Sequence, residues 1–305
     1  MKTSSNLERV LNAGHFAVTA ELGPPTSANV EVVKKKAKIL KGYVDAFNVT
    51  DGQTAVVRMA SWATCLIARE EGLDPIVQMT TRDRNRIALQ MDILGVSALG
   101  ISNILCLTGD HMKFGNHPMA EGVFDLDSVQ LIQVVRQMRD EKKFQCGDEM
   151  DVEPRLFIGA AVNPFAEPFE FRVARLEKKV AAGAEFIQTQ CLFNLEKFAE
   201  WMKRVCDLGL HEKVRILAGL TPIKSLGAAK YMKYRVPGMD VPDSVLERFK
   251  GVPKKEIPRE GIKFAVETIE QLKEMEGVSG VHIMAIEWEE AVPEIVQSAG
   301  LYPRP

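Results

Sequence analysis

The sequence lacks any apolar run close to the roughly 20 residues that a membrane-spanning helix needs. Its first residues, MKTSSN, contain no apolar signal region, so we expect a cytoplasmic protein without a membrane span. It also lacks a strong excess of charge, because the formal net charge is only -2. That balance gives no general reason to bind nucleic acid or an anionic membrane, and a small-molecule partner is expected.

Cysteine and histidine are sparse and scattered. The five cysteines form no C-x-x-C pair and no regular spacing, which argues against a disulfide framework, a zinc knuckle or an iron-sulfur cluster in this chain. Reduced and mostly buried thiols are expected instead. The histidines are His15, His111, His117, His211 and His282. Because metal sites cluster their ligands, this dispersion predicts no metal site.

No G-x-G-x-x-G motif follows any apolar run, which argues against an open dinucleotide-binding sheet. What the chain does contain is an alternation of strand-like and helix-like segments. Short apolar runs, read as strands, occur at 16–20, 43–49, 75–79, 103–107, 156–162, 185–190, 214–219 and 280–286. Helical spacing occurs at 30–40, 55–71, 86–95, 126–139, 172–182, 195–207, 225–234 and 262–275. Eight such units predict an α/β fold, a (β/α)8 TIM barrel.

We expect one domain over residues 1–305, because 46% of the chain is hydrophobic and no linker divides it. Two segments do not fit the repeating unit. A proline- and glycine-containing stretch predicts an inserted loop and short helix at about 235–255, near a barrel rim. The charged segment 141–153 is expected to be a surface connection at the rim opposite the strand ends.

Polar residues stand at or just after the predicted strand ends, where a barrel carries its chemistry. Glu21 follows the first strand and precedes Gly23-Pro24-Pro25, which stops strand and helix alike. The others are Thr50-Asp51-Gly52, Gln78, Thr108-Gly109-Asp110, Asn163-Pro164, Gln190 and Thr221-Pro222. Carboxylates, amides and hydroxyls without a histidine suit an amide-rich heterocycle. The structural alternatives are a rim salt bridge for Glu21 and a helix N-cap for Asp110.

Five motifs, in order and covering most of the chain, resemble the methylenetetrahydrofolate reductase family in a short form that contains only the catalytic barrel. They are 19–25 (TAELGPP), 48–50 (NVT), 107–110 (LTGD), 181–184 (AAGA) leading to Thr189-Gln190, and 218–222 (AGLTP). The resemblance implies a flavin, FAD or FMN, and reduction of 5,10-methylenetetrahydrofolate to 5-methyltetrahydrofolate by hydride from flavin N5.

In this resemblance Glu21 is the general acid that helps to open the five-membered ring of the folate. An apolar strand mouth raises the pKa of a carboxyl group, as that role requires near neutral pH. Asp110 matches an acid near the flavin N1 and O2 side that also meets the pterin, and its charge would lower the flavin potential. Gln190 matches a side chain that binds the pterin or the nicotinamide.

The resemblance also implies a set of cofactor contacts: Thr50, Gln78, Leu107, Thr108, Gly109, Asp110, Ala161, Asn163, Lys178 and Lys179. The lysine pair would suit the phosphates, although an exposed helix face explains it as well. The chain departs from the family at Gln78, where histidine is common, and at Thr108, where arginine is usual. Leu226 stands where a phenylalanine often stacks on the aminobenzoate ring of the folate. The segment 169–172 (FEFR) differs near the adenosine half of the cofactor, which keeps FMN open.

The expected substrate is methylenetetrahydrofolate, and the electron donor is either a reduced nicotinamide or an iron-sulfur partner subunit. An oligomer or a hetero-complex is expected. Two other functions stay open, namely a pterin-dependent methyltransferase and a flavin-binding electron-transfer subunit of a larger complex. The donor, the choice between FAD and FMN, the oligomeric state and the direction of net flux are not decided by the sequence.

Overall fold

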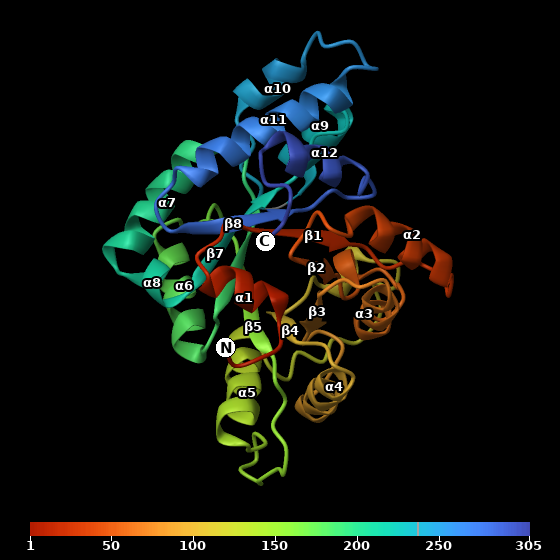
Figure 1. Ribbon diagram of the computed structural model, residues 1–305, viewed down its shortest axis with the longest axis vertical. Coiled ribbons are helices and arrows are strands. Elements are labelled where there is room, and N and C mark those ends of the chain that lie inside the picture. The colour runs from red at the N-terminus through yellow and green to blue at the C-terminus, as the bar shows by residue number, and fades with distance from the viewer. Residues whose placement is uncertain (237) are drawn as a thin grey trace.

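The computed structural model describes residues 1–236 and 238–305. Eight parallel strands close into a barrel in the order of the chain, with helices around it (Figure 1). The closure is visible in the register, because Ala20 on the first strand pairs with Phe47 on the second and with Ile283 on the last. The prediction of a (β/α)8 TIM barrel is confirmed.

The strands begin and end within a few residues of the predicted segments. They are β1 (Ala17–Leu22), β2 (Ala46–Val49), β3 (Pro75–Thr80), β4 (Asn103–Leu107), β5 (Phe157–Val162), β6 (Phe186–Cys191), β7 (Arg215–Leu220) and β8 (Val278–Ile283). The second strand starts three residues later than expected, because Gly42 has φ +83° and the chain is still turning there. Glu21 was expected just after the first strand, but β1 extends to Leu22, so Glu21 lies inside the strand, one residue before its end.

Helices alternate with the strands. They are α1 (Asn6–Asn12), α2 (Val30–Leu40), α3 (Ser61–Glu70), α4 (Arg86–Ala98), α5 (Ser128–Glu141), α6 (Phe171–Ala182), α7 (Leu195–Asp207), α8 (Leu210–Lys213), α9 (Leu226–Arg235), α10 (Asp243–Phe249), α11 (Ile257–Lys273) and α12 (Ala291–Ser298). The helix expected over 55–71 starts only at Ser61. Thr54 and Ala55 have positive φ and form a separate 3₁₀ turn, η1 (Gln53–Ala55).

The amino-terminal end of the barrel is closed by α1, which the sequence analysis did not anticipate. Leu7, Val10 and Leu11 of this helix pack against a layer of inward-facing strand side chains that includes Phe157 and Phe186. The Ser5 hydroxyl caps the helix by accepting from the Glu8 backbone N–H at 3.0 Å. The carboxyl-terminal end of the barrel is left for the functional site.

The two segments outside the repeat lie at opposite ends of the barrel. Residues 142–153 connect α5 to β5 on the amino-terminal side. Within 235–255 the chain forms α10, which packs with α9 around Phe249 and Val245. Both helices lie outside the barrel, on the side of β1 and β8 (Figure 1). Pro237 of that segment lies outside the described residues. In the described part of the chain, no helix is long and apolar enough to cross a bilayer.

Candidate active site

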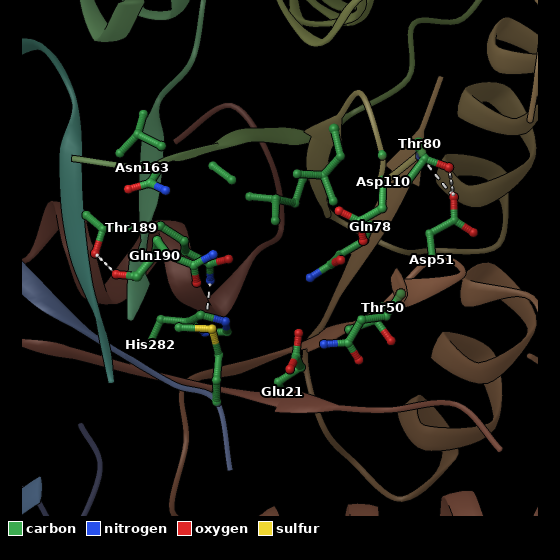
Figure 2. Close-up of a pocket in the computed structure, with 18 of the residues that line it drawn as sticks. Glu21, Thr50, Asp51, Gln78, Thr80, Asp110, Asn163, Thr189, Gln190 and His282 are labelled. Atoms are coloured by element: carbon green, nitrogen blue, oxygen red, sulfur yellow. Dashed lines mark hydrogen bonds between the residues drawn. The ribbon is translucent and has the colours of Figure 1, made fainter. Parts of the chain in front are cut away.

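A cavity of about 480 Å³ opens at the carboxyl-terminal ends of the strands (Figure 2). Its size lies in the range of cofactor and small-molecule sites. Most of the side chains that the sequence assigned to a site line it: Glu21, Thr50, Gln78, Leu107, Gly109, Asp110, Ala161, Asn163, Lys179 and Gln190. The convergence expected from a barrel therefore holds for residues from β1 to β6.

Three residues that the resemblance assigned to a site do not line this cavity, nor does Thr221 after β7, whose hydroxyl lies 2.6 Å from Cys191 Sγ. The Thr108 hydroxyl accepts from the backbone N–H of Ser128 at 3.2 Å and so holds the start of α5. Lys178 is exposed on the outer side of α6. Leu226 opens α9 and packs against the cluster around Phe249. The structure thus gives Thr108 and Lys178 positions away from the cavity wall, whereas Lys179 turns inward.

Glu21 is half-buried at the cavity wall, between the fully buried Ala20 and Leu22 on β1. No described residue donates a hydrogen bond to its carboxyl group or forms an ion pair with it within 4 Å, so it is not a rim salt bridge. Burial raises its pKa to about 7, and the negative charge of Glu289 adds to the rise, while Arg58 and Lys36 oppose it. The group is therefore poised to hold or release a proton near neutral pH.

Asp110 has a different setting, because it is exposed on the loop after β4. Its Oδ2 accepts from the backbone N–H of Thr54 at 2.9 Å, and its main-chain oxygen accepts from Arg82 at 3.2 Å. It is not the N-cap of α5, a role that Asp127 fills with a capping box. Gly109 before it has φ +93°, and an added Cβ would lie 3.1 Å from both Arg82 and Thr80.

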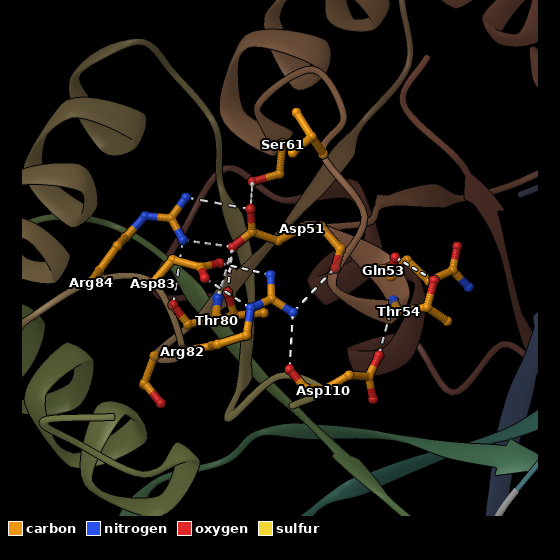
Figure 3. A network of polar contacts seen from close by, with 12 residues as sticks. Asp51, Gln53, Thr54, Ser61, Thr80, Arg82, Asp83, Arg84 and Asp110 are labelled. Carbon is orange, nitrogen blue, oxygen red and sulfur yellow. Dashed lines mark hydrogen bonds and ion pairs between the residues drawn. The ribbon is translucent and has the colours of Figure 1, made fainter. Parts of the chain in front are cut away.

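One wall of the cavity is a closed polar network (Figure 3). Asp51 accepts from the backbone and hydroxyl of Thr80 at 2.9 and 3.0 Å, from Arg84 at 2.7 Å and from Ser61 at 3.4 Å. Arg82 binds both oxygens of Asp83 and reaches the backbone oxygen of Gly52 at 3.2 Å. These carboxylates already have their partners, so the wall is rigid and Asp51 is committed to structure.

The expectation of a site without histidine is wrong, because His282 on β8 lines the cavity floor and is only 3% exposed. Its Nδ1 lies 2.9 Å from the Thr19 hydroxyl, and burial lowers its pKa to about 3, so the ring is neutral. Next to it, Gln188 and Asn48 exchange two amide hydrogen bonds of 2.7 and 2.8 Å. Strand alternation indicates Thr19, Asn48 and Gln188, because each stands two positions before an assigned site residue and so lies on the same face of its strand.

Three basic side chains gather on one side of the cavity. Lys179 is buried, donates from Nζ to the backbone oxygen of Ala161 at 2.5 Å, and has its pKa lowered to about 8 by burial and then by Arg175. Arg172 and Arg175 also line the cavity but were not assigned to the site from the sequence. Fixed positive charge of this kind suits an anionic group such as a phosphate.

A second group of polar side chains lies at the amino-terminal end of the barrel, away from this cavity. Among the described residues, Cys206, His211 and Glu276 form a group whose potential ligand atoms lie within 4.8 Å of one another. They come from the end of α7, from α8 and from the turn before β8, on the amino-terminal side. Cys65, Cys106 and Cys191 are buried free thiols, as expected.

Comparison with known proteins gives matches along almost the whole chain. A family model described as "Methylenetetrahydrofolate reductase" matches residues 6–300. The chain is 23% identical over 312 residues to methylenetetrahydrofolate reductase 2 of Schizosaccharomyces pombe, an alignment that covers 99% of this chain and 48% of that protein. It is 23% identical over 298 residues to 5,10-methylenetetrahydrofolate reductase of Salmonella typhimurium, covering 95% of this chain and 93% of that protein.

The chain thus spans about a third to a half of the length of the eukaryotic relatives that it matches, and nearly all of the bacterial one. Among solved structures, an uncharacterized protein from Clostridium thermocellum, described as binding two copies of 5-methyl-5,6,7,8-tetrahydrofolic acid, superposes with a TM-score of 0.69. The identity is 14%, and the match covers 97% of this chain and 99% of that chain. At this identity the likeness supports the fold.

Proposed function

The chain belongs to the methylenetetrahydrofolate reductase family, and from that premise we propose that it catalyses the flavin-dependent reduction of 5,10-methylenetetrahydrofolate to 5-methyltetrahydrofolate. The observation that supports this most directly is Glu21, a carboxyl group at the mouth of the barrel whose pKa is raised to about 7. Opening the five-membered ring of the folate needs a proton donor, and a carboxyl with this pKa is an effective general acid at neutral pH.

Glu21 is suited to meet the substrate directly. Its carboxyl group forms no hydrogen bond with the described residues, so no protein acceptor competes with a ring nitrogen of the folate for its proton. Its apolar neighbours on β1 disfavour the carboxylate, which raises the protonated fraction of Glu21 near neutral pH. We assign to Glu21 the proton transfer to the leaving ring nitrogen.

Gln190 and Asp110 are the proposed contacts to the pterin ring. Gln190 lines the cavity, and its Oε1 accepts from the backbone N–H of Cys191 at 3.0 Å, which holds the amide and leaves its NH₂ group without a described partner. Asp110 uses one oxygen to hold Thr54, so the other is available to a ligand. Leu226 stays a prediction as the contact for the aminobenzoate ring.

The family implies a flavin, FAD or FMN, and the residues at the cavity fit one. The Thr50 hydroxyl is buried with no hydrogen-bond partner among the described residues, which suits a polar ligand edge. Gly109 permits close approach of a flat ring, and Arg172, Arg175 and Lys179 suit the phosphate. A bound flavin would supply the hydride. Gln78, Leu107, Ala161 and Asn163 are proposed to hold it in place.

The test starts from the purified protein. Absorbance and mass identify the bound chromophore and separate FAD from FMN. The protein is then reduced without oxygen and mixed with methylenetetrahydrofolate, and we expect the yellow colour to return as 5-methyltetrahydrofolate forms. NADH and NADPH are tested as donors by whether they bleach the oxidised protein, and failure of both favours an iron-sulfur partner subunit.

Two outcomes would contradict the proposal. A yellow protein that is reduced but is not reoxidised by methylenetetrahydrofolate would be a flavin-binding electron-transfer subunit. A colourless protein that transfers a methyl group to or from a pterin would be a methyltransferase, because that chemistry needs no flavin.

A further inference from the structure

A second, smaller cavity of about 30 Å³ adjoins Glu21. Glu21 and Gln53 line both cavities, whereas Lys36, Arg58 and Glu289 line only the small one. Glu21 therefore lies between the two cavities. The large one is the ligand cavity of the candidate active site, and the small one, lined by Lys36, Arg58 and Glu289, is a charged compartment. The volume is sufficient for a water molecule, and the surrounding side chains offer it polar partners.

The compartment is built around a shielded ion pair. Lys36 Nζ on α2 lies 2.6 Å from Glu289 Oε1, just before α12, and the Glu289 side chain is only 6% exposed. Arg58 donates from Nη1 to the backbone oxygen of Pro24 at 3.0 Å, and its Nε is buried with no described hydrogen-bond partner. A buried carboxylate that is held in place by a lysine exerts a fixed, weakly screened field on its neighbours.

We propose that Glu289 is a positioning residue that keeps Glu21 in its protonated form, and that Lys36 holds Glu289 in place and limits the strength of this effect. The proposal rests on the proposed function, because it concerns Glu21 as an acid. Glu289 touches neither ligand cavity nor substrate and acts only through Glu21.

Two other acids line the small cavity, and because Glu287 is exposed whereas Glu289 is buried, Glu289 is the main source of negative charge at Glu21. Lys36 and Arg58 are cations, and both favour the carboxylate form of Glu21. Cys191 on β6 is a neutral thiol, because burial raises its pKa to about 12, and His282 on β8 is a neutral imidazole. Glu289 is the largest charge contribution to the raised pKa of Glu21 after burial itself.

The experiment is a carbon-13 NMR titration of Glu21 in the 305-residue chain, with the Glu21 signal identified by its absence in Glu21→Gln. In Glu289→Gln, which keeps the shape of the side chain, we expect the midpoint of Glu21 to fall by about one pH unit. Adding Lys36→Met to that variant is expected to move the midpoint back upward, because a cation is removed. Glu287→Gln, at an exposed residue that lines the same small cavity, is the control and is expected to leave the midpoint unchanged.

The order of midpoints, with Glu289→Gln lowest and the double variant above it, is a result that general loss of structure does not produce. An unchanged Glu21 midpoint in Glu289→Gln overturns the inference, even if the protein reduces folate. A midpoint that shifts as expected in a protein that does not reduce methylenetetrahydrofolate overturns the proposed function and leaves the role of Glu289 standing. In an active enzyme the loss of kcat at high pH follows the same order.

Discussion

The two ends of the barrel differ in whether selected buried polar groups have hydrogen-bond or ion-pair partners. Beside α1 at the amino-terminal end, Asp45 pairs with Arg304 at 2.6 Å and the Ser5 hydroxyl donates to the Asn103 side chain, whereas His211 Nδ1, farther out on α8, has no partner among the described residues. At the carboxyl-terminal end the Thr50 hydroxyl has no partner among the described residues, and no described residue donates to the Glu21 carboxyl.

The difference separates stability from binding. A buried polar group that lacks a partner costs stability, so it persists where a ligand supplies the missing contact. Closure by α1 and the pairing of Asp45 and Ser5 make the amino-terminal end a structural plug. The carboxyl-terminal end combines a rigid wall around Asp51 with a poised carboxyl at Glu21, which is the arrangement that a preorganised site requires.

The largest expected effect is that of Glu21→Gln at the carboxyl-terminal end of the barrel. We expect it to lower folate reduction by about 10²- to 10⁴-fold while ligand binding and flavin reduction by the donor persist, because only ring opening needs the acid. Single-turnover reoxidation of the reduced protein measures this. An undiminished rate in Glu21→Gln removes Glu21 from the role of acid.

The same substitution has a pH signature in stability. Since the pKa of Glu21 rises from an ordinary 4.5 to about 7, folding favours the protonated group, and the stability that it contributes at low pH is lost as the pH rises through that window. Relative to Glu21→Gln, the wild type should lose Tm between about pH 4.5 and pH 7. A Tm difference that stays constant from pH 4 to pH 8 would contradict the raised pKa.

At the closed end, Arg304→Met should destabilise the protein by about 3–5 kcal/mol, because it leaves the Asp45 carboxylate buried without its cation. Urea unfolding measures the loss. The control is Arg155→Met, which breaks a surface pair with Glu153 and should cost much less. Equal effects of the two substitutions would show that the closed end is not a structural plug.

A matched pair of hydroxyl deletions compares the two ends directly. Ser5→Ala removes the N-cap of α1 and the donor to Asn103, and should cost about 1–3 kcal/mol of unfolding free energy. Thr50→Val removes a hydroxyl without a described partner, so the ligand-free protein should be unchanged or slightly more stable. The affinity for flavin should instead fall about fivefold, because one hydrogen bond to the ligand is lost. Destabilisation of the ligand-free Thr50→Val protein would contradict this view.

The smallest effect is expected for Asp110→Asn. The asparagine oxygen still accepts from Thr54, so the loop keeps its shape while one negative charge is lost. The potential of a bound flavin should rise, but only slightly, because Asp110 is exposed and solvent screens its charge. A redox titration of the flavin measures the shift, and an unchanged potential places Asp110 away from the ring.

Much of the fold could be predicted because local patterns encode it. The helices Val30–Leu40 and Leu195–Asp207 begin and end at the predicted residues. The helix Asn6–Asn12 was missed, although Ser5 three residues before Glu8 is a helix-start signal. Helical spacing from Leu176 also points to Lys179, rather than Lys178, as the inward-facing lysine.

The partners of the site residues could not be predicted in the same way. Asp51 and Glu21 are both acids at strand mouths, and no local pattern tells them apart. Asp51 meets Arg84 from the loop after β3, whereas Glu21 meets no donor among the described residues and lies near Glu289 from the other end of the chain.

The sequence by itself determined the barrel and the end at which polar side chains gather, because eight apolar strands that alternate with helices form a parallel barrel, which carries its strand-end residues to one rim. Only the tertiary structure decided which of those side chains remain available for chemistry. Hydrogen bonding, desolvation and charge depend on distances between segments remote in the chain, and these raise the pKa of Glu21 to about 7 and make Asp51 a structural carboxylate.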